Sequence, residues 1–270
     1  MEIYQKTTKL LIDVREKSPL VHHITNYVTV NDCANIVLAL GGSPVMADDE
    51  KEVKEMTSLA RALVLNIGTL NTRTIDSMII AGKTAKERNI PIILDPVGVG
   101  ATKLRTQTAK QLLAEVNPTI IRGNMSEIKI LAGIDGNIKG VDSMDDMQNG
   151  KEIALELSHK LNAIVAITGK IDIISNGTNT TFIANGHKLL SQVTGTGCMC
   201  SSLVGTYAGV TEDYYSAAIA GILSMGLAGE KSFNSLKDSE GVGTFRMRIF
   251  DNIYNLTPEI LEGEGKIHEE

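Results

Sequence analysis

The sequence is best interpreted outward from one stretch, Val193-Thr194-Gly195-Thr196-Gly197-Cys198-Met199-Cys200-Ser201. It is a glycine-rich turn that leads into a helix of small residues, predicted over 198–209. Gly195 and Gly197 allow positive φ angles and a close approach of the backbone to a ligand. The first N–H groups of a helix lack intrahelical partners and lie at the positive end of its dipole. The turn therefore predicts a pocket for an anion, most often a phosphate, with the Cys198 thiol beside it.

The same turn has a purely structural interpretation, in which its glycines serve only packing. A single Gly-Thr-Gly is a weak motif, because short glycine patterns are common in proteins. The rest of the chain therefore has to decide between a binding turn and a packing turn.

The composition predicts a folded α/β protein. The chain has 270 residues, of which 43% are hydrophobic and 21% charged, so it can bury a sizeable core. No linker-like stretch interrupts it, and we expect one domain over residues 1–270. The net charge of −6 argues against nucleic acid as the main partner, since that role needs a basic face. Nucleotides remain possible ligands, because they bind through local groups.

Cysteine usage and hydropathy predict a location in the cytoplasm. The N-terminus has no signal-peptide pattern, and no apolar run approaches the ~18 residues that span a membrane. Cys33, Cys198 and Cys200 do not form a disulfide framework, and no Cys/His spacing is typical of zinc sites. We therefore expect neither a membrane partner nor a structural metal.

Short apolar runs alternate with helical patterns through the middle of the chain. Strands are predicted at 62–67, 90–95, 118–122 and 163–168, and helices at 1–20, 71–88, 106–116, 124–132, 144–161 and 216–229. A hairpin is predicted at 171–184 around Asn176-Gly177, and the tail at 262–270 is predicted to fray. This alternation predicts a mostly parallel sheet with helices on both faces.

Successive predicted strands end in a polar residue that glycine soon follows. The four strand ends read Asn66-Ile-Gly, Asp95-Pro-Val-Gly, Arg122-Gly and Thr168-Gly. In open α/β sheets, ligands bind beyond the carboxyl ends of the strands. These side chains should therefore converge on one rim that faces the glycine turn. Arg122 and Thr168 suit phosphate oxygens and Asp95 suits magnesium, so the set favours a nucleotide with its metal.

The segment Asn124-Met-Ser-Glu127 has two interpretations. An Asn-x-x-Glu pattern at the start of a helix is typical of a capping box. Its position beside Arg122 also allows Glu127 to bind magnesium through water. Both interpretations stay open at the level of the sequence.

The segment at 20–48 is dense in hydrogen-bonding groups. Asn26 is predicted to cap the helix that follows it. His22 and His23 are either structural or a ligand or base, and because neighbours on a strand point opposite ways, at most one faces a site. Met46 is either part of the core or an adaptable apolar wall for a small ligand.

Five of these segments together resemble the ribokinase-like kinases and, more narrowly, the hydroxyethylthiazole kinases of thiamine salvage. They are His23-Ile-Thr-Asn-Tyr-Val, Gly42-Ser-Pro-Val-Met-Ala, Asp95-Pro-Val-Gly-Val-Gly-Ala-Thr, Arg122-Gly-Asn and Val193-Thr-Gly-Thr-Gly-Cys. The resemblance implies a ribokinase-like three-layer α/β/α fold with a mostly parallel central sheet. It also implies ATP- and magnesium-dependent phosphorylation of the hydroxyl of 4-methyl-5-(2-hydroxyethyl)thiazole. The family is trimeric, with a pocket completed by the neighbouring subunit, so a homotrimer with active sites at its interfaces is implied.

The resemblance carries roles onto the matching positions. By this resemblance, the residues that contact the substrate are Met46, Gly195 and Asn26. The residues implied to contact ATP are Arg122, Thr168 and Thr194, and those implied to bind magnesium are Asp95 and Glu127. The implied catalytic groups are Cys198 and an anion hole made by Gly195, Thr196 and Gly197.

Cys198 departs from the wider superfamily, where most members have an aspartate as catalytic base at this place. Hydroxyethylthiazole kinases share the cysteine, so the narrow assignment survives. A helix N-terminus lowers the pKa of a thiol from roughly 8.5 toward neutrality, while bound ATP raises it again. Cys198 is therefore expected to act as a base, as a positioning group or merely as a small residue at the helix start.

Two other functions stay open. One is a ribokinase-like kinase for another small alcohol, such as hydroxymethylpyrimidine or a sugar, although the Met46 loop and the His-Ile-Thr-Asn segment favour the thiazole. The other is a nucleotide-binding sensor without turnover, which the cysteine in place of aspartate favours.

Overall fold

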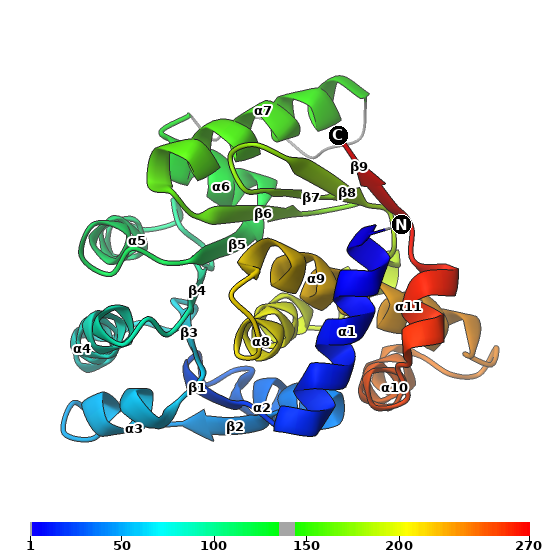
Figure 1. Ribbon diagram of the computed structural model, residues 1–270, viewed down its shortest axis with the longest axis horizontal. Helices are drawn as coiled ribbons and strands as arrows, with labels where there is room; N and C mark the ends of the chain where they lie inside the picture. The colour runs from blue at the N-terminus through cyan, green and yellow to red at the C-terminus, as the bar shows by residue number, and fades with distance from the viewer. Residues whose placement is uncertain (1, 135–143) are drawn as a thin grey trace.

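The computed structural model describes residues 2–134 and 144–270 of the chain. Within these ranges nine strands form one sheet in the order β2-β1-β3-β4-β5-β6-β7-β8-β9 (Figure 1). The strands are β1 (Leu20–Ile24), β2 (Ser43–Met46), β3 (Ala62–Asn66), β4 (Ile92–Asp95), β5 (Ile120–Asn124), β6 (Ile164–Thr168), β7 (Asp172–Ser175), β8 (Thr180–Ile183) and β9 (Ile267–Glu269).

The six strands from β2 to β6 in this order are parallel, and β7, β8 and β9 add antiparallel pairs. The predicted mostly parallel sheet is therefore confirmed. Register matters for the site, because Asn66 pairs with Asp95 and Asn124 pairs with Thr168. The polar ends of neighbouring strands consequently lie side by side on one rim of the sheet.

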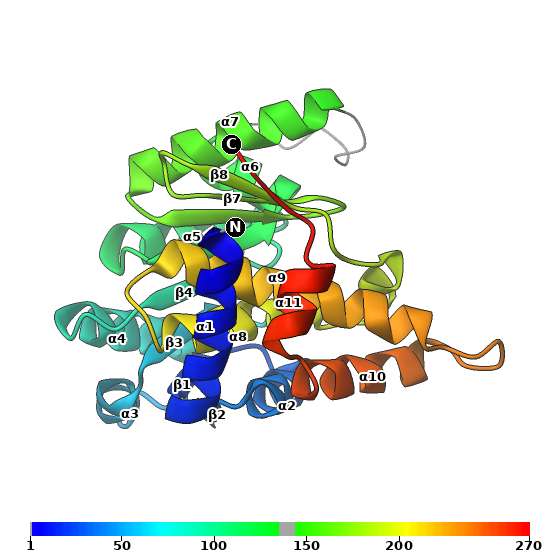
Figure 2. The same cartoon turned by 45° about the vertical axis from the view of Figure 1, so that its right-hand side comes forward.

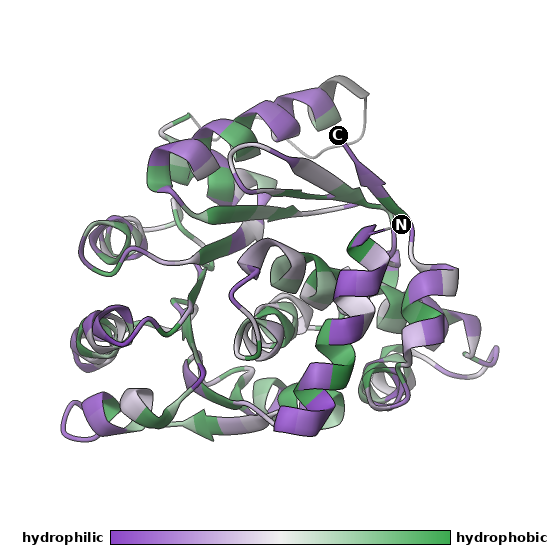
Figure 3. Cartoon of the chain, in the orientation of Figure 1, coloured by the Kyte–Doolittle hydropathy of each residue, from purple (hydrophilic) through white to green (hydrophobic). Residues whose placement is uncertain are grey.

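Helices cover both faces of the sheet (Figures 1 and 2). One layer contains α3 (Val53–Leu59), α4 (Thr72–Glu87), α5 (Lys103–Glu115), α6 (Met125–Ala132) and α7 (Met144–Leu161). The other contains α1 (Glu2–Lys17), α2 (Val30–Leu40), α8 (Thr196–Ala208), α9 (Tyr214–Asn234), α10 (Val242–Tyr254) and α11 (Pro258–Glu264), with a 3-10 turn, η1 (Lys188–Gln192). A separate hydrophobic cluster fills each interface, and the outer helices present their hydrophilic residues away from the sheet (Figure 3). The sheet and its two helical layers make up the predicted three-layer arrangement.

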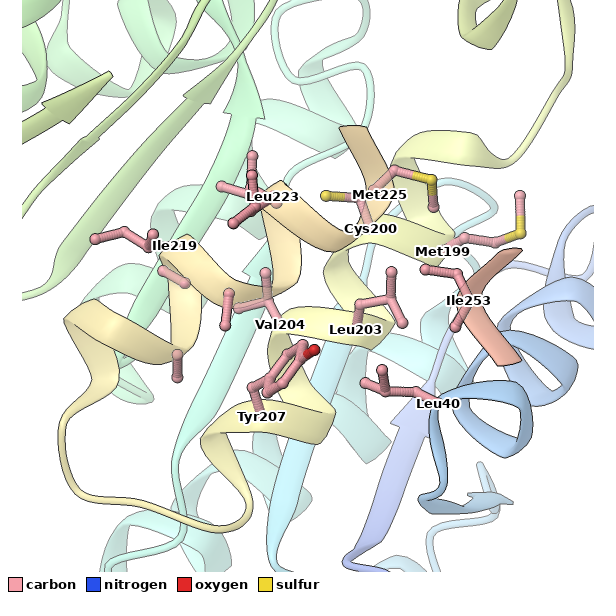
Figure 4. Close-up of a cluster of buried hydrophobic side chains, with 14 of the residues drawn as sticks. Leu40, Met199, Cys200, Leu203, Val204, Tyr207, Ile219, Leu223, Met225 and Ile253 are labelled. Carbon is pink, nitrogen blue, oxygen red and sulfur yellow. The ribbon is translucent and has the colours of Figure 1, made fainter. Parts of the chain in front are cut away.

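Helix α8 lies in the middle of its layer, between the sheet and α9. Every residue from Met199 to Ala208 is buried, which explains why this helix is apolar or small on all sides. Two glycines permit the close packing: a Cβ at Gly205 would lie 2.6 Å from Val64 Cγ2, and one at Gly221 of α9 would lie 2.6 Å from the Val204 nitrogen. Apolar side chains of both helices interdigitate around Tyr207, whose hydroxyl hydrogen-bonds Ser224 at 2.9 Å (Figure 4).

Two local predictions are wrong because tertiary contacts override them. Asn26 does not cap α2; the cap position belongs to Thr29, whose N–H donates to Asn26 Oδ1 at 3.1 Å. The C-terminal tail does not fray, because β9 pairs with β8 and the Ile267 N–H donates to the hydroxyl of Tyr4 at 3.1 Å. Among the helices of the described ranges, none is long and apolar enough to cross a membrane.

Gly221→Ala should destabilise the fold by about 1–3 kcal/mol, because the new methyl group would meet the backbone of α8 rather than a flexible side chain. Gly263→Ala in α11 is the matched control, since nothing lies within 4 Å of a Cβ there. It should raise stability by up to about 1 kcal/mol through helix propensity. Urea unfolding of both variants measures the difference, and equal effects would show that α8 and α9 are not tightly packed at Gly221.

Candidate active site

A cleft of about 750 Å³ lies beyond the carboxyl ends of β4, β5 and β6 and against the start of α8. Its wall includes Asp95, Arg122, Glu127, Thr168, Gly195, Thr196, Gly197 and Cys198. The structure thus brings together the polar strand ends and the glycine turn, as the sequence predicts. The cleft forms there because parallel strands end on one side and the first turn of α8 faces them.

The start of α8 presents free backbone donors to this cleft. Gly195 is the cap residue with a φ of 93°, and its carbonyl accepts the first helical hydrogen bond from the Met199 N–H at 2.8 Å. The N–H groups of Thr196, Gly197 and Cys198 precede that bond and have no place in the helical ladder. The Thr196 hydroxyl faces elsewhere, donating to the Leu190 carbonyl at 2.9 Å. The anion site therefore consists of backbone groups, which the helix dipole supports.

Gly197 is required at its position for a reason other than the predicted positive φ angle. It lies inside α8 and does not adopt a positive φ, unlike Gly195. A Cβ at this position would lie 2.8 Å from Arg122 Nη1. The absent side chain therefore leaves room for a cation directly against the helix N-terminus.

Arg122 is the central cation of the cleft. Its side chain is only 13% exposed, its Nη2 donates to the Thr168 hydroxyl, and its Nη1 lies 3.9 Å from Asp95 Oδ1. Within the described residues its Nε has no hydrogen-bond partner. A buried guanidinium with spare donors beside free helix N–H groups is a suitable environment for phosphate oxygens.

Asp95 is fully buried and uses its two oxygens differently. Its Oδ2 accepts hydrogen bonds from Asn66 Nδ2 and Ser201 Oγ, both at 2.9 Å. No group in the described part of the chain hydrogen-bonds its Oδ1. Burial raises the pKa of Asp95 to about 6, with the Arg122 charge opposing the shift and the Glu127 charge adding to it.

Glu127 forms the capping box that its spacing predicts. Its Oε2 accepts the Asn124 N–H at 2.8 Å, and its Oε1 accepts the Gly98 N–H at 2.9 Å. The second bond holds the loop that follows β4. Each carboxylate oxygen retains a second lone pair, so the cap and a water-mediated magnesium contact are compatible.

The residues present fit a magnesium ion held together with a substrate. Mg²⁺ usually keeps several waters and binds one or two carboxylates plus substrate phosphates. Asp95 and Glu127 both line the cleft, and Asp95 Oδ1 is a buried carboxylate oxygen without a partner in the described structure. Within residues 2–134 and 144–270, no group of three His, Cys, Asp or Glu side chains is arranged to hold a metal without such phosphates.

Cys198 lies at the third position of α8, with two amide groups on its sulfur. Asn26 Nδ2 and Asn66 Nδ2 each lie 3.3 Å from Sγ. The predicted lowering of its pKa is wrong: burial raises the pKa of the Cys198 thiol, and the charge of Asp95 adds to this, while hydrogen bonds from neighbouring side chains oppose it. Desolvation thus outweighs the hydrogen bonds to the sulfur, and the thiol is neutral at pH 7 before any ligand binds.

Comparison with known proteins agrees with this geometry. Residues 11–259 match the family model described as the hydroxyethylthiazole kinase family. The chain belongs to the hydroxyethylthiazole kinase family. It is 54% identical to hydroxyethylthiazole kinase of Alkaliphilus oremlandii over 100% of both chains, and 50% identical to that of Clostridium tetani over 99% of both.

Solved structures show the same fold. A hydroxyethylthiazole kinase from Pyrococcus horikoshii superposes with a TM-score of 0.90 at 38% identity, over 98% of this chain and 99% of that one. Pyridoxal kinase from Staphylococcus aureus has a TM-score of 0.60 at 15% identity, over 82% of this chain and 90% of that one, and shares the fold alone. The predicted ribokinase-like three-layer fold is therefore confirmed.

Three of the residues expected in the site do not line the cleft. Asn26 is buried behind it and reaches it only through Cys198. Met46 is half-buried at the end of the edge strand β2, and Thr194 is exposed. Of the three residues expected to contact the substrate, Gly195 thus lines the cleft, whereas Asn26 and Met46 lie outside its wall.

The two adjacent histidines have structural partners. His22 hydrogen-bonds Thr57 Oγ1 at 2.9 Å and the Ala47 carbonyl at 2.7 Å, while His23 Nε2 lies 3.1 Å from Ser202 Oγ. Burial lowers the pKa of both rings, to about 4 for His23. The structural interpretation is favoured for both, because each ring is buried and hydrogen-bonded at both nitrogens.

Two polar residues of the site were given no role from the sequence. Asn66 was expected on the rim as one of the polar strand ends, and in the structure it contacts both Asp95 and Cys198. Asp172 lines the cleft at the start of β7 and accepts the Gly169 N–H at 2.9 Å, while burial raises its pKa to about 7. Its signal was weaker, because only the antiparallel pairing of β6 with β7 returns it to the rim beside Thr168.

Asp95→Asn should raise stability while removing activity. Burial raises the pKa of Asp95 from 3.8 to about 6, so the unmutated fold loses stability as the pH rises from about 4 to about 6 and none beyond. The neutral amide avoids this loss and should be on the order of 3 kcal/mol more stable at pH 8. Urea unfolding between pH 4 and 8 measures it, with Asp251→Asn on the exposed face of α10 as control. A stability difference that does not change with pH would contradict the argument.

Proposed function

We propose that this chain transfers the γ-phosphoryl group of ATP to the hydroxyl of 4-methyl-5-(2-hydroxyethyl)thiazole, a step of thiamine salvage. One observation carries the proposal: the free N–H groups of α8 face Arg122, Thr168 and Asp95 across one cleft. Phosphoryl transfer depends mainly on positioning and on neutralising phosphate charge, and these groups can do both. Membership of the kinase family supports ATP as the phosphoryl donor.

The triphosphate occupies the cleft between α8 and the strand ends in this proposal. The N–H groups of Thr196, Gly197 and Cys198 receive the phosphoryl oxygens, and Arg122 with Thr168 binds from the opposite side. Because Arg122 is already fixed against Thr168, little side-chain entropy is lost when it binds phosphate. Thr194 lies outside the cleft wall, so its proposed contact requires the nucleotide to extend past Gly195.

Asp95 and Glu127 are the proposed magnesium residues. When bound, the ion neutralises negative charge on the phosphate oxygens of ATP. Asp95 contributes its unpartnered Oδ1, while Asn66 and Ser201 hold its other oxygen. Glu127 remains bound to the Gly98 and Asn124 N–H groups and acts through water.

The acceptor alcohol lies beside Cys198 on the side of Asn26 and Met46. As the new bond between the alcohol oxygen and phosphorus forms, the bond to the β-phosphate oxygen breaks, and the hydroxyl passes its proton to an oxygen of the transferred phosphoryl group or to solvent. The transition state is loose, so the alcohol needs little deprotonation early in the reaction. A neutral Cys198 thiol therefore acts first as a positioning group in this proposal, and its sulfur takes up a proton only when ionised.

A homotrimer with shared sites is proposed for this chain. Exposed apolar side chains occur just before and along α2 and on α10, which packs against α2, at Tyr27, Val28, Leu38, Met247 and Tyr254. Helix α2 begins beside the glycine turn at Gly195, since a Cβ at Gly195 would lie 2.7 Å from Cγ2 of Thr29, the residue that precedes α2. A partner subunit on this surface would cover the apolar groups and close the acceptor side of the site.

We also propose that residues 1–270 work as one kinase domain, supported by the single sheet that contains strands from β1 to β9. A cytoplasmic location is proposed from the three free cysteines, which would remain reduced there.

The unmutated protein should release ADP with the thiazole alcohol faster than with hydroxymethylpyrimidine or ribose. The reason is that the Gly42-Ser-Pro-Val-Met46 turn offers apolar contacts and few polar side chains to bind sugar hydroxyls. A coupled ADP-release assay with each alcohol, and with no acceptor, measures the ratio. Faster turnover of another alcohol would favour a related kinase, and tight ATP binding without turnover would favour a sensor.

Cys198→Ala should lower kcat by less than the upper end of the 10²–10⁴-fold range typical of general bases. The thiol is neutral before substrate binds, so most of the rate comes from the backbone donors and Arg122. Cys198→Asp should retain activity, since a carboxylate accepts a proton well. Steady-state kinetics of both variants at several pH values, with Arg122→Ala for comparison, check this. A Cys198→Ala enzyme that binds ATP but has no detectable turnover would show that the sulfur is essential.

Leu38→Glu should dissociate the oligomer and lower activity together. The substitution places a charge on a side chain that is 56% exposed in the single chain and lies on the proposed contact surface. Sedimentation at assay concentration measures the oligomeric state, with Leu59→Glu, a 69% exposed position on α3, as the control. A fully active monomer would contradict the shared site.

A further inference from the structure

Asn66 connects the two chemically distinct parts of the site through a single amide. Its Nδ2 donates to Asp95 Oδ2 at 2.9 Å and to Cys198 Sγ at 3.3 Å. Its Oδ1 accepts from the Gly68 N–H at 2.9 Å and from Asn26 Nδ2 at 3.0 Å. The side chain is 2% exposed, so these four partners use the full hydrogen-bonding capacity of the amide without water.

The orientation of this amide is fixed by an unambiguous donor. The Gly68 backbone N–H can only donate, so the atom of Asn66 that faces it must be the carbonyl oxygen. The NH₂ group must then face Asp95 and Cys198. Asn26 is oriented by the same logic, because the Thr29 N–H donates to its Oδ1 at 3.1 Å and leaves its NH₂ toward Asn66 and Cys198.

This arrangement determines which atoms of Asp95 and Cys198 already accept hydrogen bonds and which remain available. Asp95 Oδ2 is occupied by Asn66 and Ser201, so only Oδ1, which lies 3.9 Å from Arg122 Nη1, accepts no hydrogen bond among the described residues. Two amide N–H groups, from Asn66 and Asn26, hold the sulfur of Cys198. Hydrogen bonds of this kind stabilise a thiolate more than a thiol, so they favour the ionised form against burial.

We propose that Asn66 is a positioning residue for the phosphoryl transfer, holding the Cys198 sulfur and the Asp95 carboxylate in register through one amide. The inference rests on the proposed function for its catalytic consequence, but the two contacts are independent of it. Asparagine suits this place because its NH₂ offers two donors to two acceptors. Aspartate would offer no donor and would place a second carboxylate 2.9 Å from the first.

Gly68 supports the same interpretation. A Cβ at this residue would lie 2.9 Å from Asn66 Oδ1 and 3.0 Å from Asn26 Cβ. The glycine that follows this strand end therefore lets the loop cover the amide and donate its N–H. The Asn66-Ile-Gly pattern thus serves to hold a side chain rather than to contact a ligand directly.

Asn66→Ala should change both halves of the site at once. In the protein without substrates, alkylation of Cys198 by iodoacetamide should shift to higher pH and be about tenfold slower at pH 8, because the thiolate loses one hydrogen bond. Peptide mass spectrometry separates Cys198 from the buried Cys33 and Cys200. In the assay, kcat should fall about 10- to 100-fold and more magnesium should be needed, while KM for the thiazole alcohol changes little.

Two matched variants separate positioning from general destabilisation. Ser201→Ala removes a hydrogen bond from Asp95 alone, so it should raise the magnesium requirement and leave the alkylation profile of Cys198 unchanged. Asn252→Ala removes an amide that donates to Ser232 Oγ at 3.0 Å, outside the cleft lining, and should change neither property. Thermal unfolding confirms that each protein is folded. Asn66→Leu retains most of the side-chain volume and adds no charge beside Asp95, so it replaces Asn66→Ala if that variant unfolds.

The alkylation profile decides the proposal. A folded Asn66 variant whose Cys198 reacts like that of the unmutated protein would overturn it, as would an unchanged magnesium requirement. Failure of the unmutated protein to phosphorylate the thiazole alcohol would instead overturn the proposed function, because the alkylation measurement needs no substrate.

Discussion

The buried carboxylate of Asp95 is the constraint on which the site depends. It joins β3, β4, β5 and α8, because its partners Asn66, Arg122 and Ser201 come from three different elements. A fully buried charge is costly unless polar groups surround it, and here each one also holds a neighbouring part of the sheet or helix. The carboxylate therefore fixes the position of α8 relative to the strand ends.

The position of α8 in turn depends on small residues. Gly205 lets the helix approach the sheet at Val64, and Gly221 lets α9 approach it from the other side. A helix buried on both sides cannot shift without opening a cavity, so its first turn is held rigidly against Arg122. Preorganised donors of this kind bind phosphate charge without rearranging, which is the main requirement of phosphoryl transfer.

The loops around the cleft are held by backbone hydrogen bonds to charged side chains. Glu127 accepts one N–H group from the loop after β4 and one from the end of β5, and Arg105 donates to the carbonyls of Val97 and Gly68 at 2.7 and 2.6 Å. These bonds connect the segments that follow β3, β4 and β5. The rim of the sheet is consequently a single rigid structure, on which Asn66 lies between the proposed acceptor side and the proposed nucleotide side.

The sequence by itself determined the layers, the parallel sheet and most of the cleft, because these follow from local periodicity and from the rule that parallel strands end on one side. It correctly placed Asp95, Arg122, Thr168 and the turn at Gly195 on one rim. Only the tertiary structure decided properties that depend on distant partners. Burial raises the pKa of Cys198, which was expected to be lowered. Gly197 is required because Arg122 occupies the space of a side chain there. The tail that was expected to fray is ordered by the pairing of β9 with β8. Desolvation and long-range pairing leave no trace in a local pattern, since both are set by residues far apart in the chain.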